Sequence, residues 1–189
     1  MGFQIEDGSG SGKQVGVTTN SELKTHSVSV SEEHSANMDY GEAYSWTFSD
    51  DPDANDDCIF YIKNTNDKNL CLEGLDLYVS GACEVYFEVD NTGTTAAGTD
   101  VTAANLNTSS GKSAVVTAKH DGDLQSGATL ATGIETARWK FTAATATSQF
   151  NFPQDLIITP QQTFTIWVDT AGVVLQATLY GYFFNPTRD

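Results

Sequence analysis

The residues of this sequence that could do chemistry include a conspicuous acidic loop, DDPDANDD (50–57). Its oxygen-bearing side chains alternate like the first ligands of an EF-hand calcium loop, at Asp51, Asp53, Asn55 and Asp57. An EF-hand also needs a glycine and a bidentate glutamate at fixed later positions, which here hold Asp56 and Ile62. The pattern therefore favours a solvated acidic loop, and a looser calcium site built from the same oxygens stays open as an alternative.

Two glycine-rich segments resemble phosphate-binding loops, GSGSGKQ (8–14) and SSGKS (109–113). In the first, Asp7 and Gln14 stand where glycine and a magnesium-binding Ser or Thr are needed. In the second, Leu106 takes the place of the first glycine, and no strand-to-helix pattern surrounds it. We predict a linker and a hairpin turn, and no nucleotide site.

The histidines and cysteines do not form a ligand pattern either. His26, His34 and His120 share no metal-ligand spacing, and Cys58, Cys71 and Cys83 include no C-x-x-C pair. No G-x-S-x-G motif marks a nucleophile. The sequence therefore predicts no catalytic, cofactor-binding or metal-binding residue, and a protein that is not an enzyme. An odd number of cysteines favours buried thiols in a reducing cytoplasm, although a Cys58–Cys71 disulfide remains open.

Charge limits the partners of the chain. Its 189 residues carry 25 acidic and only 9 basic side chains, a formal net charge of −16. Phosphate contacts need clustered Lys and Arg, so we expect no nucleic-acid partner. Anionic lipid surfaces would repel the chain, and neither a signal peptide nor a run of about 20 apolar residues is visible. We expect no membrane partner.

The elements that must position these residues are short strands. Apolar and polar residues alternate in segments such as 44–48, 83–90 and 163–169, and turn residues separate about eight to ten such segments. This pattern predicts an all-β fold, a jelly-roll-like β-sandwich over residues 40–189. Trp46 shares the parity of the apolar positions and should lie in the core. Trp167 has the opposite parity to Phe164 and Ile166, so we expect it to be exposed, as an interface aromatic.

Residues 1–39 differ in composition from the rest. They begin with a Gly- and Ser-rich stretch and continue with few apolar residues. We interpret them as a flexible N-terminal segment and an extended arm that lies on a neighbouring surface. The predicted contacts of this arm with a capsid or another subunit are Val15, Val17, Leu23, Val28 and Val30.

The order of the segments resembles that of virion surface proteins of tailed bacteriophages. The resemblance lies in GKQVGVTTNSELKTHSVSVSEEHSANMDYGEAYSWTF (12–48), CIFYIKNTNDKNLCLEGLDLYVSG (58–81), TDVTAANLNTSSGKSA (99–114) and LIITPQQTFTIWVDT (156–170). It covers most of residues 13–185 and is one of style and spacing, without a fixed site motif. It implies a jelly-roll or related sandwich on a virion, of the capsid decoration (cement) or head-fibre type, and commonly a trimer.

From the residues and the resemblance together we expect a non-catalytic virion protein that binds the outside of a phage capsid and stabilises it. The expected partners are the major capsid protein and further copies of the chain, as a homotrimer. The expected location is the virion surface, after folding in the host cytoplasm. The alternative is a carbohydrate- or receptor-binding module of a tail or fibre, which would need an exposed aromatic platform or a calcium-dependent loop.

Overall fold

The computed structural model describes residues 31–185 except 94, 96–97, 122–123, 125–129 and 146, and describes only the backbone of 153–155. The chain divides into two compact units, Met1–Ser31 and Glu32–Asp189. Apart from Ser31, the described residues all belong to the second unit. The predicted arm residues Val15, Val17, Leu23, Val28 and Val30 lie outside the described residues.

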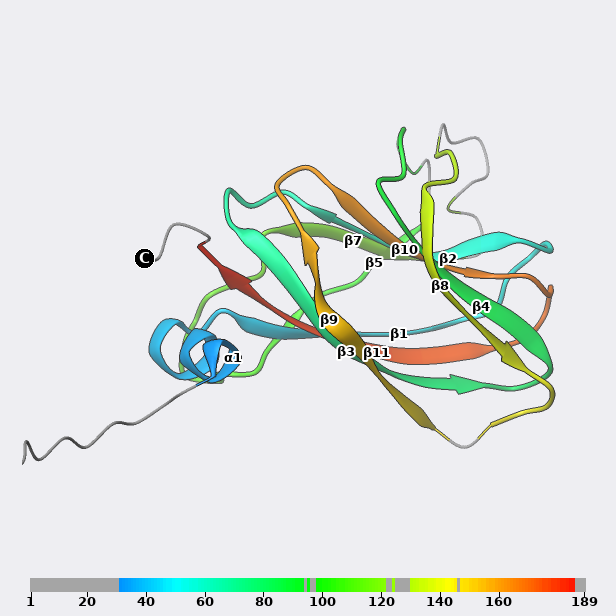
Figure 1. Cartoon of the computed structure of the whole chain (residues 1–189), viewed down its shortest axis with the longest axis horizontal. Helices are drawn as coiled ribbons and strands as arrows, with labels where there is room; N and C mark the ends of the chain where they lie inside the picture. Colours follow the sequence, from blue (N-terminus) through cyan, green and yellow to red (C-terminus); the bar gives the residue numbers. More distant parts are fainter. Residues whose placement is uncertain are drawn as a thin grey trace, which may run out of the picture. The chain divides into compact units, whose positions relative to one another are not determined.

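Two antiparallel sheets form the second unit (Figure 1). The first has the order β6 (Ala104–Asn105), β1 (Ala43–Asp50), β11 (Leu175–Phe184), β3 (Asn69–Val79) and β9 (Ser148–Ile158). The second has the order β5 (Thr99–Asp100), β7 (Val116–His120), β2 (Asp57–Asn64), β10 (Thr163–Val168), β4 (Cys83–Val89) and β8 (Ile134–Phe141). The predicted all-β sandwich is confirmed.

The core lies between the sheets and follows the period of two in the sequence. In β10, Phe164, Ile166 and Val168 are fully buried, as their alternation with polar residues predicts. Trp46 on β1 is also fully buried, which confirms its predicted place in the core. Burial of such large side chains is the main source of stability of the sandwich, at about 1.5–3 kcal/mol for each fully buried large apolar side chain.

A short helical segment precedes the first strand. It consists of α1 (Glu32–Ser35) and a π-helical turn, η1 (Ala36–Tyr40), and it ends at Gly41 in the left-handed region with φ of 61°. Ala36 is buried against Ala43, Cys71 and Tyr182. The prediction of an extended arm up to residue 39 is therefore wrong for residues 32–39. This stretch has too few apolar residues to show a helical period in the sequence. Its helix is stabilised by one buried alanine and by its C-terminal cap.

The prediction that Trp167 is exposed is wrong. Its position on the strand does place the ring on the outer face of the second sheet, away from the main core, as its parity predicts. However, the ring is only 1% exposed, because Leu124 and Leu130 cover that face together with Tyr86. Leu124 and Leu130, which belong to a turn-rich segment, thus bury a residue whose position on its strand alone predicts exposure to solvent.

The three cysteines form no disulfide, and all are buried. Cys58 packs in the cluster around Trp167 on the outer face of the second sheet, whereas Cys71 packs beside Ala36 on the first sheet. The two side chains lie in different sheets and point to different clusters, so the alternative of a Cys58–Cys71 bridge is wrong. Burial raises the pKa of the Cys83 thiol to about 11 and that of Cys58 well above its usual value.

Candidate functional site

The acidic loop between β1 and β2 is closed by its own last carboxylate. Asp57 is only 4% exposed, and its Oδ2 atom accepts a hydrogen bond from the backbone N–H of Asp53 at 3.2 Å. Burial raises the pKa of Asp57, against the opposing effect of its backbone hydrogen bonds. Within the part of the chain that the structure describes, no three His, Cys, Asp or Glu side chains gather to hold a metal ion. Calcium also binds amide and carbonyl oxygens, so the alternative of a calcium site in this loop stays a prediction.

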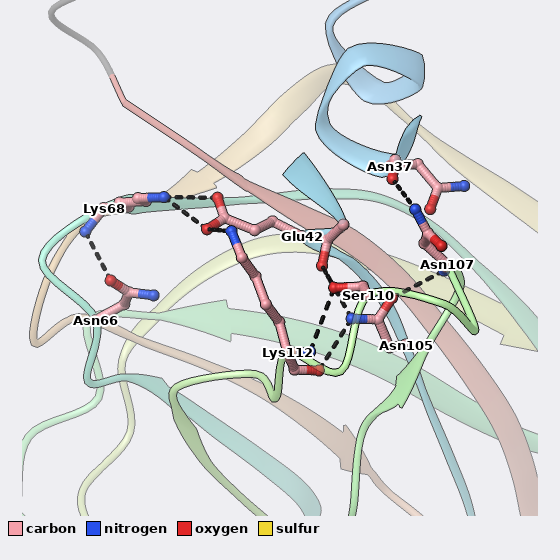
Figure 2. Close-up of polar contacts among 9 residues, drawn as sticks. Asn37, Glu42, Asn66, Lys68, Asn105, Asn107, Ser110 and Lys112 are labelled. Atoms are coloured by element: carbon pink, nitrogen blue, oxygen red, sulfur yellow. Dashed lines mark hydrogen bonds and ion pairs between the residues drawn. The ribbon is translucent and has the colours of Figure 1, made fainter. Parts of the chain in front are cut away.

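A cluster of ion pairs fastens the end of the helical segment to the sandwich (Figure 2). Glu42 follows the cap residue Gly41, and its side chain is 14% exposed. Its carboxylate accepts hydrogen bonds from Lys68 Nζ at 2.6 Å and from Lys112 Nζ at 2.9 Å. Lys68 immediately precedes β3 and Lys112 lies between β6 and β7. One carboxylate thus ties together three segments that are far apart in the sequence.

Polar side chains of β6 and of the segment between β6 and β7 bond to the backbone of the same helical end (Figure 2). Asn105 Nδ2 and Ser110 Oγ both donate to the carbonyl oxygen of Gly41, each at 2.9 Å. Asn107 Nδ2 donates to the carbonyl oxygen of Asn37 at 2.8 Å. The Gly41 carbonyl group thereby gains two partners at the end of the helical segment, and the Asn37 carbonyl group gains one besides the backbone N–H of Gly41.

We refer to Glu42, Lys68, Lys112, Asn105, Asn107 and Ser110 as the exit cluster, because it lies where the chain leaves the helical segment and enters the sandwich. The hollow beside Glu42 and Lys68 measures about 50 Å³, which is room for a few water molecules. The ion pairs and hydrogen bonds of the cluster therefore hold the end of the helical segment against the sandwich. Sequence reasoning missed it, although SSGKS (109–113) was singled out as a motif and contributes two of its members.

Glu42→Gln is expected to lower the free energy of unfolding by about 1–2 kcal/mol at pH 7, since both ammonium groups lose a charged partner. Burial opposes ionisation of Glu42, but Lys68 and Lys112 outweigh it and hold the pKa of its carboxyl group below the usual value. A depressed pKa stabilises the fold above the pKa of the unfolded chain, and this contribution is lost as pH falls through the folded pKa. Urea unfolding at pH 7 and pH 3 measures this. The difference in free energy of unfolding between wild type and Glu42→Gln should be smaller at pH 3 than at pH 7.

The matched control is Glu135→Gln, which removes the exposed ion pair with Arg138 on β8. Its side chain is 41% exposed, so solvent screens the pair and we expect a much smaller effect at pH 7. If the loss of unfolding free energy in Glu42→Gln is equally large at both pH values, the ionic role of Glu42 is contradicted.

An apolar groove opens between the two sheets at the side formed by β8 and β9. These strands are the last of their sheets, and no further described strand pairs with their outer edges. The half-buried side chains Trp139, Phe150, Phe152 and Leu156 line the groove, whose volume is about 610 Å³. Trp139 packs on the core residue Phe87 with 4.6 Å between ring centroids. The groove thus combines apolar surface with two sheet edges that can accept a partner.

Comparison of the chain with models of known protein families, with curated protein sequences and with solved structures found no match. Among the described residues, no helix is long and apolar enough to cross a membrane.

Proposed function

We propose that this chain is a non-catalytic structural protein of a tailed-phage virion, which binds the outside of the capsid as a decoration protein and stabilises it. The observation that carries the proposal is the division of the chain into an N-terminal unit, Met1–Ser31, and a sandwich with its own core. A division of this kind suits a protein that is held on a larger surface through its N-terminal unit, because the core residues that the structure describes all lie in Glu32–Asp189.

The strand order supports the jelly-roll reading of the sandwich. Its eight strands of six or more residues are ordered β1-β11-β3-β9 in one sheet and β2-β10-β4-β8 in the other. Along the chain, successive long strands change sheet at every step except β4 to β8, and the first and last strands pair with each other. We infer that this strand order is a jelly roll. Because jelly rolls have many functions, the fold alone does not indicate a virion role, and that part of the proposal rests on the resemblance in sequence.

Two surfaces supply the proposed partners. The apolar residues of the N-terminal unit, Val15, Val17, Leu23, Val28 and Val30, are proposed to contact the major capsid protein. The apolar groove at β8 and β9 is the proposed contact between copies of the chain in a homotrimer, because aromatic side chains are enriched in the cores of such interfaces. The proposed location is the virion surface, after folding in the host cytoplasm. Three buried cysteines without a disulfide are compatible with that reducing compartment.

The test is the number of copies of the chain on purified particles, relative to the major capsid protein. A decoration protein on a symmetric lattice should be present at about one third of a copy to one copy per capsid subunit. A few copies per particle would assign the chain to a fibre or tail instead. Its complete loss from washed particles would overturn the virion role and favour a free carbohydrate- or receptor-binding module.

The same assay on a chain shortened to residues 32–189 tests the N-terminal unit. We expect the shortened chain to keep its β-sheet circular dichroism, because the sandwich core lies in Glu32–Asp189, and to lose binding to undecorated particles. The cut is placed before α1, because a cut at residue 39 would remove the buried Ala36 and with it part of the fold. Binding that survives the truncation would contradict the role of residues 1–31.

A further inference from the structure

The outer face of the first sheet carries a flat array of polar side chains. Two neighbouring rows cross β1, β11 and β3, since Thr47 pairs with Thr178 and Thr178 with Asp76. In the next row Ser49 pairs with Gln176, which pairs with Tyr78. We call these six residues the polar face: Thr47, Ser49, Asp76, Tyr78, Gln176 and Thr178. Together with Phe48, His120, Thr147 and Ala177 they line a shallow hollow of about 500 Å³.

The composition of the polar face departs from that of the chain. Among the six residues are three hydroxyl side chains, one amide and one phenol, and Asp76 is the single charged member in a protein with 25 acidic side chains. The polar groups are already ordered: Tyr180 donates to Asp76 Oδ2 at 3.0 Å, and the hydroxyls of Thr47 and Thr178 lie 3.0 Å apart. The face therefore offers both donors and acceptors in fixed positions.

The opposite outer face of the sandwich is different. There Leu124 and Leu130 cover the second sheet and bury Trp167. On the first sheet Thr47, Ser49 and Gln176 are exposed, so the polar face is open to a ligand.

The chemistry of the polar face selects among ligand classes. Nucleic acid would need Lys or Arg, and none of the six residues is basic. A calcium ion would need several carboxylate or carbonyl oxygens, and Asp76 is the one carboxylate. A protein partner would be expected to meet an apolar centre, and the apolar residues of the hollow, Phe48 and Ala177, are buried. An uncharged ligand rich in hydroxyl groups matches the hydroxyls and amide, and its carbon faces can pack on the ring of Tyr78.

We propose that the polar face binds a neutral oligosaccharide. Asp76 and Gln176 hydrogen-bond to sugar hydroxyls, and Tyr78 supports one face of a sugar ring. The site lies on the sandwich alone and does not depend on the proposed virion role. Neither a tryptophan platform nor the acidic loop takes part in it, and no single stretch of sequence indicates the site, because its residues come from three strands.

The first experiment applies the full chain to an array of neutral, sialylated and sulfated oligosaccharides, with calcium and with a chelator. We expect binding to neutral members that the chelator does not change. The soluble form of the strongest neutral member is then titrated by calorimetry. Binding confined to charged members, or no binding at millimolar concentrations, would overturn the proposal.

The variants Tyr78→Ala and Asp76→Asn should each weaken binding of that oligosaccharide at least tenfold, since each removes a proposed contact. Ile134→Ala is the matched control, because Ile134 is 63% exposed on β8 of the other sheet, and its affinity should equal that of wild type. Thermal unfolding of each variant checks the fold, and Gln176→Ala serves in place of a variant that does not fold. Unchanged affinity in the folded variants would place any sugar site elsewhere. The chain shortened to residues 32–189 keeps all six residues of the polar face. It can therefore lose binding to particles and still bind the oligosaccharide, so each proposal can be contradicted without the other.

Discussion

Replacing Asn91 by alanine is expected to lower the free energy of unfolding by about 3 kcal/mol, because two buried side chains and one partly buried carbonyl group lose a partner at once. Asn91 is 6% exposed and lies just after β4. Its Nδ2 atom donates to Glu88 Oε2 at 2.9 Å and to the carbonyl oxygen of Ala131 at 3.3 Å. Its Oδ1 atom accepts from the hydroxyl of Thr165 at 2.9 Å.

The reason for so large an effect is that the two side chains that bond to Asn91 have little access to water. Glu88 is 5% exposed and Thr165 is fully buried. Without Asn91, the Glu88 carboxyl group keeps the backbone N–H of Gly133, which donates to it at 2.8 Å. The network continues to Trp167, whose Nε1 atom donates to Thr165 Oγ1 at 2.7 Å. Loss of Asn91 should therefore also loosen the cover over Trp167 and shift its fluorescence to longer wavelength.

Urea unfolding of Asn91→Ala measures the effect, and Asn151→Ala is the matched control. Asn151 is an exposed asparagine on β9, and its replacement should change the free energy of unfolding by less than about 0.5 kcal/mol. Glu88→Gln keeps an acceptor for Gly133 and removes the charge, so Asn91→Ala should cost less in that background than in wild type. Equal losses for Asn91→Ala and Asn151→Ala would mean that the network contributes no stability.

The sequence predicts the strands of this fold well, because alternation with period two reports directly on which side of a strand faces the core. Phe164, Ile166 and Val168 illustrate this, since polar residues separate them and all three are buried. The same rule assigns Trp167 to the outer face correctly. It cannot report that Leu124 and Leu130 cover this face, because such a contact depends on the path of a segment about 40 residues away in sequence.

The exit cluster and the polar face could not be predicted for a related reason. Glu42, Lys68 and Lys112 are ordinary charged residues, and only the pairing of distant strands brings both ammonium groups within 3 Å of the Glu42 carboxylate. The rows of the polar face likewise need the register between β1, β11 and β3, which turn residues alone do not set. Local patterns therefore give the elements, whereas sites assembled across strands require the three-dimensional structure.

Gly181→Ala is expected to lower the free energy of unfolding by about 3 kcal/mol or more, because its new methyl group would overlap the backbone of the neighbouring strand. A Cβ atom at Gly181 would lie 2.5 Å from the carbonyl oxygen of Cys71. The pairing of β11 with β3 shifts register at this point, between Tyr180 and Gly181, and leaves Glu73 as an extra residue on β3. Relief of the overlap would have to move one of two central strands of the sheet.

Gly81→Ala is the matched control for thermal and urea unfolding. Its Cβ atom would meet Val173 at 3.5 Å, an ordinary packing distance, so we expect a change of less than about 1 kcal/mol. Equal stability of the two variants would show that β11 and β3 can separate at Gly181 without loss of pairing.

The irregularity at Gly181 also separates the exit cluster from the polar face. On one side of it, Cys71 and Tyr182 point outward under Ala36, beside the exit cluster. On the other side, Asp76 and Thr178 point outward into the polar face. The extra residue on β3 is what allows odd-numbered Cys71 and even-numbered Asp76 to share the outer face of one strand. A folded Gly181→Ala protein should therefore bind neutral oligosaccharide more weakly than wild type, although it alters no proposed contact residue. Unchanged affinity for the oligosaccharide would show that the polar face is held independently of the bulge.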